Sequence, residues 1–357
     1  MNQAAQDVVP AGTVDDCSLT GALSNVQVID ISVNAPGPFA SMMLADMGAS
    51  VVSIENPVHG APVYAGAADD PMLAGRGGPN DALARGKARR ALNLKSDEGR
   101  AALVEMVAGA DVFISEMRPG KLESLGLGWD ALRTVNPRLI LCEITGYGRA
   151  VGHATKAGHD INYLALSGAL SLIRDASGKP IVPQNLIGDY SAGGAMAVSA
   201  ILAALFERER TGSGKHINLS MTDGIRYLMS DISAATLLAG SPESSWRATL
   251  NGGMPTYDTY QTADGSWMAV GALEPKFIAE LAARLDWPEL SAKMERKDGW
   301  DEAREGLRMR FASRSREEWD RIFDGSDACV VPVLSLDEMR STAVARLAEV
   351  FGSRADF

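Results

Sequence analysis

The sequence predicts an α/β fold, in which an open and mostly parallel sheet is flanked by helices. Three observations lead to this prediction. Short apolar runs typical of buried strands alternate with longer segments of helical character. The alternation begins with a β-α-β unit, which favours parallel pairing of its two strands. The chain has 357 residues, 46% of them hydrophobic, and this length suggests about two domains.

The β-α-β unit lies near the N-terminus. Val26–Ile31 has the composition of a short buried strand, and Phe39–Met47 has that of a helix, which Gly48 ends. Val51–Ile54 is the next predicted strand. No Gly-x-Gly-x-x-Gly motif follows the first strand, so the sequence does not support a nicotinamide or flavin dinucleotide site.

The alternation then continues for most of the chain. The predicted elements are a helix at Asp97–Ala108 capped by Ser96, a strand at Val112–Ser115, a helix at Trp129–Val135, a strand at Leu139–Ile144, a helix at Ser191–Arg210, a strand at His216–Leu219 and a helix at Met221–Leu238. Ligands of such sheets bind beyond the carboxyl ends of the strands. The segment Thr145–Asp160 directly follows a strand, so we expect it at the binding edge.

A smaller α/β domain is predicted after Gly240. Tyr257–Thr262 and Trp267–Gly271 flank an Ala-Asp-Gly turn and so predict a hairpin, and Ser315 with Glu318 forms a capping box. We therefore expect a flexible extension at 1–20, a large domain at 21–239, a small domain at 240–335 and a short tail at 336–357.

Composition excludes several classes of function. The net charge of −11 weighs against binding to nucleic acid or to anionic membranes. No apolar run approaches the roughly 20 residues of a membrane span, and the first 20 residues lack a secretory signal, so we expect a cytoplasmic protein. The three cysteines are scattered without a Cys-x-x-Cys pair, which argues against disulfides and a zinc site.

Four residues are candidates for acid/base chemistry. His159 and Asp160 are adjacent, Asp189 follows about 30 residues later, and Glu274 lies in the predicted small domain. They suggest two pairs around one carbon, His159 with Asp189 and Asp160 with Glu274, able to remove a proton from one face and return it to the other. Asp189 and Glu274 also suit a purely structural role as helix caps, and both roles can coexist.

Several motifs carry a family resemblance, which extends from about Leu19 to about Val344. They are Gly158–Gly168 (GHDINYLALSG), Glu116–Gly120, Gly126–Gly128, Thr145–Gly148, Tyr257–Tyr260, Ala263–Gly265 and Ser326–Cys329. Together they resemble the alpha-methylacyl-CoA racemases, a group within the family III CoA-transferases of the CaiB/BaiF type.

The resemblance implies an isomerase of lipid metabolism that racemises 2-methylacyl-CoA thioesters by α-proton abstraction and reprotonation. It implies no metal and no redox cofactor, with CoA as the carrier part of the substrate. It further implies an interlocked homodimer, whose active site lies between the large domain of one chain and the small domain of its partner. In this scheme Asp189 orients His159, and Asp160 shares one proton with Glu274.

Cations for CoA are expected in the run Arg85–Arg90, which carries four positive charges in six residues. On its own this run is better explained as a solvated basic loop than as a binding site. The resemblance implies CoA contacts, for which the candidates are Arg85, Lys87, Arg89, Arg118 and Tyr163. Two departures weaken the expected CoA site: Ser53 stands where related chains usually carry Arg or Lys, and the tail after the small domain is short.

Two alternative functions remain open at this stage. A family III CoA-transferase would use Asp189 as a nucleophile and form a mixed anhydride, which needs neither His159 nor Glu274. Transferase chains usually show Gly-Tyr-Asp at Gly158–Asp160, so His159 favours the racemase. A non-catalytic partner subunit of the same fold is the other alternative, motivated by Ser53 and the short tail. The sequence does not indicate the acyl group.

Overall fold

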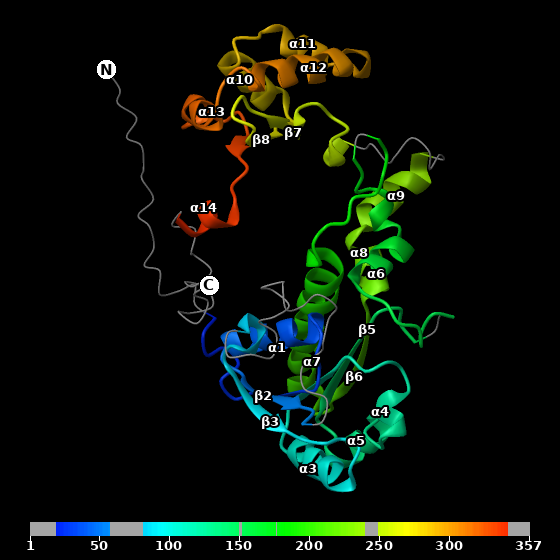
Figure 1. Ribbon diagram of the computed structural model, residues 1–357. Coiled ribbons are helices and arrows are strands. Elements are labelled where there is room, and N and C mark those ends of the chain that lie inside the picture. The colour runs from blue at the N-terminus through cyan, green and yellow to red at the C-terminus, as the bar shows by residue number, and fades with distance from the viewer. Residues whose placement is uncertain (1–18, 58–80, 150–151, 176, 240–248, 342–357) are drawn as a thin grey trace. The chain divides into compact units, whose positions relative to one another are not determined.

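The computed structural model describes residues 19–57, 81–149, 152–175, 177–239 and 249–341 (Figure 1). These residues divide into two compact units. The first unit contains the described residues up to Ala169 together with Val182–Ser230, and the second contains Leu170–Ile181 together with the described residues from Asp231 onward. Each unit has its own core and is described by itself.

The first unit is built on a six-stranded, wholly parallel sheet of order β3-β2-β1-β4-β5-β6. Its strands are β1 (Gln27–Asp30), β2 (Ser50–Glu55), β3 (Lys87–Ala91), β4 (Val112–Ser115), β5 (Ile140–Thr145) and β6 (Lys215–Ser220). Strands β4 and β5, which both lie inside the sheet, are buried along their whole length, as a sheet covered on both faces requires. The predicted open parallel sheet is therefore confirmed.

Helices cover both faces of this sheet (Figure 1). The helical elements of this unit are α1 (Pro36–Asp46), α3 (Asp97–Ala108), α4 (Lys121–Ser124), α5 (Trp129–Val135), α6 (Asp160–Ser167), the π-helical segment η5 (Leu186–Ala195), α7 (Met196–Thr211) and α8 (Met221–Leu228), with short 3₁₀ turns η3 (Ala82–Ala84) and η4 (Ala169–Ser171), the latter at the boundary with the second unit. Leu103 and Val107 of α3 and Leu132 of α5 pack with Phe113 of β4 and Leu141 of β5. On the other face, α7 packs against β5 and β6, and η5 packs against α1.

Local sequence signals explain several of these elements. Ser96 begins α3 and its hydroxyl accepts a hydrogen bond from Gly99 N at 3.1 Å, as predicted. Two glycines let η5 approach α1 closely: a Cβ on Gly193 would lie 2.6 Å from Pro36 Cβ, and one on Gly194 would lie 2.5 Å from Phe39 Cδ1. Larger side chains at these two positions would push the two helices apart.

The edge strand β3 is an element that the sequence analysis did not predict. Lys87–Ala91 pairs in parallel with β2, although we expected its basic residues to form a loop. The composition of a strand is hard to recognise here because this strand lies at the sheet edge and three of its residues are charged. The helix predicted at Met221–Leu238 is also two helices, since α8 ends before Met229.

The second unit combines a small antiparallel sheet with helices. Its elements are α9 (Ser230–Ala239), η6 (Thr249–Asn251), β7 (Tyr257–Gln261), β8 (Trp267–Gly271), α10 (Pro275–Arg284), α11 (Glu289–Met294), η7 (Lys297–Gly299), α12 (Trp300–Phe311), α13 (Arg316–Phe323), β9 (Val330–Pro332) and α14 (Leu336–Ser341). The predicted hairpin is present as β7 and β8, and Ser315 caps α13 with Glu318. Phe311, Trp319 and Phe323 pack together in its core.

The division between the units differs from the predicted boundary at residue 240. The second unit includes α9 and also 170–181, a segment that the sequence analysis assigned to the large domain. One contact that ties this segment to the second unit is a hydrogen bond from Asn251 Nδ2 to Leu172 O at 3.1 Å. Such a contact between residues far apart in the chain leaves no local signal in the sequence.

Within the described part of the chain, one helical segment is long and apolar enough to cross a membrane, judged by length and composition alone. It is Leu186–Thr211, the continuous helix formed by η5 and α7. In its most apolar window 44% of the residues are buried, and α7 packs on the sheet. Core helices of soluble proteins pass the same test, so this segment is weak evidence for a span.

Candidate active site

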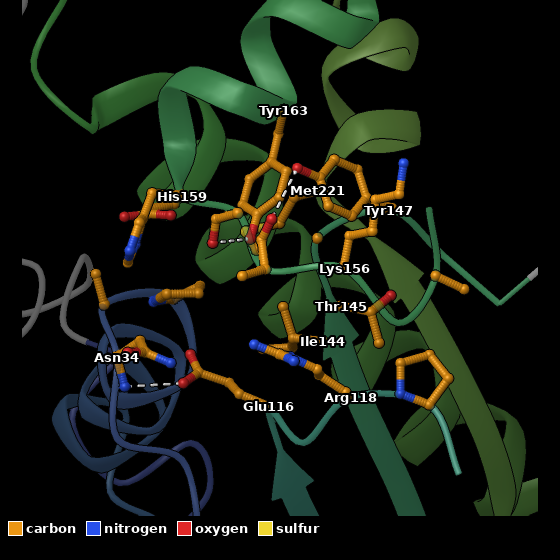
Figure 2. A pocket seen from close by; sticks show the side chains of 18 of the residues that line it. Asn34, Glu116, Arg118, Ile144, Thr145, Tyr147, Lys156, His159, Tyr163 and Met221 are labelled. Carbon is orange, nitrogen blue, oxygen red and sulfur yellow. Dashed lines mark hydrogen bonds between the residues drawn. The ribbon is translucent and has the colours of Figure 1, made fainter. Parts of the chain in front are cut away.

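A cavity of about 390 Å³ opens at the carboxyl ends of β4 and β5 (Figure 2). Its wall combines Asn34–Pro36 at the start of α1, Glu116 and Arg118 after β4, and the end of β5 with Gly146 and Tyr147. The wall is completed by the segment before α6, by the first turn of η5 and by Met221. The binding edge predicted after β5 is therefore where the structure has a cavity.

His159 and Asp189 both line this cavity, although they come from different elements. His159 precedes the first residue of α6, in extended backbone geometry, and its N–H donates to Asn162 Oδ1 at 3.0 Å. Asp189 is half-buried in the first turn of η5, where its Oδ2 accepts from Asn185 Nδ2 at 2.9 Å. The structure thus brings together the histidine and one of the predicted carboxylates.

Asp160, the second predicted acid/base residue, is not among the residues that line the cavity, and only 7% of it is exposed. Its Oδ2 accepts hydrogen bonds from Gly188 N at 2.7 Å and from Asp189 N at 2.9 Å. A Cβ on Gly188 would lie 2.4 Å from the same oxygen, so glycine is needed there. Asp160 therefore holds the start of η5, and with it the backbone of Asp189.

Two opposing effects act on the ionisation of Asp160. Burial raises the pKa of this carboxyl, while the N–H groups of Asp189 and Gly188 act in the other direction.

The predicted pairing of Asp160 with Glu274 is not shown, because Glu274 belongs to the second unit. There Glu274 precedes α10 with an exposed side chain that makes no capping hydrogen bond. The capping role considered for Glu274 is thus absent.

Two tyrosines support the wall near His159. Tyr163 donates its hydroxyl to Gly158 O at 2.5 Å, and its ring meets that of Tyr147 edge-on with 5.0 Å between centroids. A Cβ on Gly146 would lie 2.2 Å from the Tyr163 ring, and one on Gly158 would lie 2.3 Å from Tyr147 Oη. Burial raises the pKa of Tyr163 far above its usual value, so this cavity-lining phenol stays neutral.

The predicted CoA-binding cations fall into two groups. Arg118 lines the cavity, and its Nη1 donates to Thr155 O at 3.3 Å. Arg85 instead forms an ion pair with Asp46 at 2.7 Å, and Arg89 forms one with Glu55 at 3.3 Å. These ion pairs do not test whether Arg85 and Arg89 bind phosphate, so that role stays a prediction.

Lys87 does not fit the predicted phosphate contact. Its side chain is 2% exposed, and Nζ donates to Pro38 O at 2.7 Å and lies 3.6 Å from Asp30 Oδ2. Burial lowers its pKa, and Asp30 opposes this effect. Because the ammonium group is enclosed by these partners, Lys87 ties β3 to β1 and α1 and does not present its charge to a ligand. Ser53, where we expected relatives to carry a cation, pairs in register with Arg89 on β3.

A second cavity of about 340 Å³ adjoins the first and was not foreseen. Apolar side chains line it, among them Leu92, Leu94 and Met117, and Lys95 and Lys121 add two positive charges. The two cavities have two residues in common, Asn34 and Glu116. The sequence contained a signal for this cavity, because two leucines, Leu92 and Leu94, precede Lys95 directly after the basic cluster.

Among the described residues, no group of three or more histidine, cysteine, aspartate or glutamate side chains has the geometry to hold a metal ion. The residues of the two cavities are instead of the kinds that move protons and bind anions. An open parallel sheet with such a cavity at its carboxyl edge defines an α/β protein with a ligand-binding site at the usual position of this class.

Comparison with known proteins narrows this class. The chain belongs to the CoA-transferase family III, whose model matches residues 23–353. It is 40% identical over 322 residues to alpha-methylacyl-CoA racemase from Homo sapiens, covering 89% of this chain and 79% of the relative. It is 31% identical over 340 residues to succinyl-CoA:glutarate CoA-transferase from Mus musculus, covering 92% of this chain and 76% of the relative.

A solved structure shows the same architecture. Rv3272 from Mycobacterium tuberculosis superposes with a TM-score of 0.73 at 27% sequence identity, covering 90% of this chain and 85% of that one. The predicted family and α/β fold are therefore confirmed, as is the prediction of an isomerase similar to alpha-methylacyl-CoA racemase.

Proposed function

We propose that this protein racemises 2-methylacyl-CoA thioesters by moving the proton on the carbon next to the thioester carbonyl. The observation that carries the proposal is that His159 and Asp189 line one cavity from two different elements. One group takes the α-proton while the C–H electrons move toward the carbonyl oxygen and form an enolate. The other group then returns a proton to the opposite face.

The enolate oxygen needs hydrogen-bond donors, and the start of α6 is suited to supply them. The first N–H groups of a helix have no acceptor within it, and this end carries a partial positive charge. In α6 these groups belong to Asp160 and Ile161, directly after His159. Donors aimed at developing charge contribute on the order of 3–4 kcal/mol to lowering a barrier. Proton transfer leaves oxidation states unchanged, so the reaction needs no redox cofactor.

The second cavity gives the CoA part of the substrate a place to bind. Its apolar walls suit the flat face of an adenine ring, and Lys95 and Lys121 carry charges that complement phosphate groups. An acyl-CoA that occupies both cavities would run along the wall formed by Asn34 and Glu116, which line each of them. Arg118, which lines the first cavity, adds a cation beside this path.

An exchange experiment in heavy water tests the proposed function. Each enantiomer of a 2-methylacyl-CoA is incubated with the protein, and deuterium at the α-carbon and the enantiomer ratio are followed together. We expect deuterium to enter as each enantiomer converts to the other. CoA transfer to an added carboxylic acid without α-exchange would instead identify a transferase, the activity named for one relative. If neither reaction occurs, the remaining alternative is a non-catalytic partner subunit of the same fold.

We further propose a homodimer in which Glu274 takes part in the acid/base chemistry, as the family resemblance implies. Glu274 has an exposed carboxylate that the start of α10 does not use. We expect sedimentation to give the mass of a dimer. We expect Glu274→Gln to slow racemisation by about 100-fold, the lower end of what acid/base groups contribute. Glu280→Gln, on the exposed side of the same helix, is the control. A fully active monomer would contradict this part of the proposal.

A further inference from the structure

Glu116 makes an unusual set of contacts directly after β4. Its Oε2 accepts hydrogen bonds from Asn34 N at 2.9 Å and from Val33 N at 3.3 Å, and its Oε1 accepts one from Gly37 N at 2.5 Å. Figure 2 shows the bond to Asn34. All three donors lie in the stretch Val33–Gly37, which runs from the turn after β1 into the first turn of α1. One carboxylate thus fixes five residues of backbone that follow a neighbouring strand.

This contact forms a wall that both cavities share. Asn34 and Glu116 line the cavity that contains His159 and Asp189, and they also line the apolar cavity next to it. A shift of the turn would therefore change the shape of both cavities along this shared wall. A misplacement of about 1 Å in a substrate-positioning wall can slow a reaction by about 100-fold.

The sequence of the turn is adapted to this carboxylate. Pro36 and Pro38 have no backbone N–H, so Gly37 supplies the donor at the start of α1. A Cβ on Gly37 would lie 3.0 Å from Glu116 Oε1 and 2.2 Å from Ser32 Oγ. Glycine at position 37 is therefore what lets the carboxylate reach this N–H.

We propose that Glu116 is a positioning residue, whose ionised carboxylate holds the turn Val33–Gly37 as the wall between the two cavities and so aligns the acyl-CoA for His159 and Asp189. The alignment part rests on the proposed function. With both oxygens engaged by backbone donors, Glu116 acts on the reaction through the turn and not as an acid or base.

The ionisation of Glu116 makes this wall sensitive to pH. Its pKa is raised from 4.5 to about 7, mainly by burial and also by nearby Asp30, while the three N–H groups oppose the shift. Lys87 and Tyr163 interact electrostatically with Glu116. Further charged or titratable groups share its two cavities: Arg118, Tyr147, Lys156, His159 and Asp189 in the first, and Lys95 and Lys121 in the second. A proton on either oxygen would face an N–H donor and break that contact. The wall should therefore loosen as the pH falls through about 7.

The effect on stability has the opposite direction. Because the folded-state pKa lies above 4.5, the folded protein holds this proton more tightly than the unfolded chain. Relative to a Glu116→Gln variant, wild-type stability falls as the pH rises from about 4.5 to about 7, and the difference is constant above that. The charge on Glu116 thus does not favour folding, and its contribution lies in the geometry of the turn.

The test compares Glu116→Gln with Glu123→Gln. Glu123 is on the same β4–α4 segment, but it pairs with Arg149 and lines neither cavity. Hydrogen exchange at the amides of 33–37 is measured at pH 8 and pH 6, corrected for the intrinsic effect of pH. We expect Glu116→Gln to reduce amide protection at pH 8 by about tenfold, from loss of hydrogen bonds to a charged group. Wild type at pH 6 should move in the same direction, and Glu123→Gln should resemble wild type.

The kinetic readout is kcat/KM for α-proton exchange as a function of pH. We expect Glu116→Gln to lower it by about 10- to 100-fold at pH 8 and to remove the fall that wild type shows below about pH 7. Unchanged amide protection in Glu116→Gln would overturn the proposal, and so would lost protection with unchanged kinetics. If wild type shows no α-exchange while the amides respond as expected, the proposed function fails but the carboxylate's hold on the turn is established.

Discussion

Replacement of His159 by alanine is expected to abolish the interconversion of the two enantiomers while sparing one half of the chemistry. His159 and Asp189 come from different elements around one cavity, so each is proposed to serve one face of the α-carbon. Without the imidazole, Asp189 can still remove and return the proton on its own face. A positioned acid/base group contributes about 100- to 10,000-fold, so racemisation should fall by that factor.

Deuterium incorporation, measured separately for each enantiomer, tests this expectation. His159→Ala should exchange the α-proton of one enantiomer without inverting it, and Asp189→Asn should do so for the other. His153→Ala is the matched control, because His153 lies on the same segment and rests against Tyr147 but does not line the cavity. Circular dichroism confirms that each variant is folded. Full racemisation by both His159→Ala and Asp189→Asn would exclude the assignment of two bases.

Elements with strong local signals were predictable from the sequence. The β-α-β start and the buried runs at β4 and β5 carry the hydrophobic pattern of a parallel sheet. Ser96 and the capping box at Ser315 mark helix starts because capping depends on residues three apart. The position of His159 at the binding edge also followed, since the segment after a parallel strand lies at that edge.

What could not be predicted depends on contacts between distant residues. Lys87 looks like a phosphate ligand in the sequence. In the structure its ammonium group pairs with the buried carboxylate of Asp30, which lies 57 positions earlier in the chain. Asp160 looks like an acid because it follows His159, yet its carboxylate turns toward the backbone of η5. Glu116 belongs to a recognised motif, but its three donors come from the β1–α1 turn. Residue type suggests chemistry, and only the fold decides which group meets which.

Asp160 offers the second decisive experiment, because two substitutions separate an anchoring role from an acid/base role. A single oxygen, Oδ2, accepts from both Gly188 N and Asp189 N. Asparagine has the same shape and can place its carbonyl oxygen at that point, so Asp160→Asn should keep both bonds. Alanine removes the acceptor and leaves two donors without a partner. Each unsatisfied buried donor costs about 1–3 kcal/mol, so Asp160→Ala should lose about 2–6 kcal/mol of folding free energy.

Racemisation should depend on the two hydrogen bonds that Asp160 accepts from the start of η5. We expect Asp160→Ala to lose racemisation because the start of η5 carries Asp189, and we expect Asp160→Asn to retain most of it.

Urea unfolding measures the free energy of unfolding of each variant, and the pH dependence of that free energy gives a further check. Burial raises the pKa of Asp160, so the folded protein binds this proton more tightly than the unfolded chain. Wild type should therefore lose stability relative to Asp160→Asn as the pH rises above the unfolded value of 3.8. If Asp160→Asn remains as stable as wild type but is as inactive as His159→Ala, Asp160 carries a proton in the reaction and the pairing first inferred from the sequence is restored.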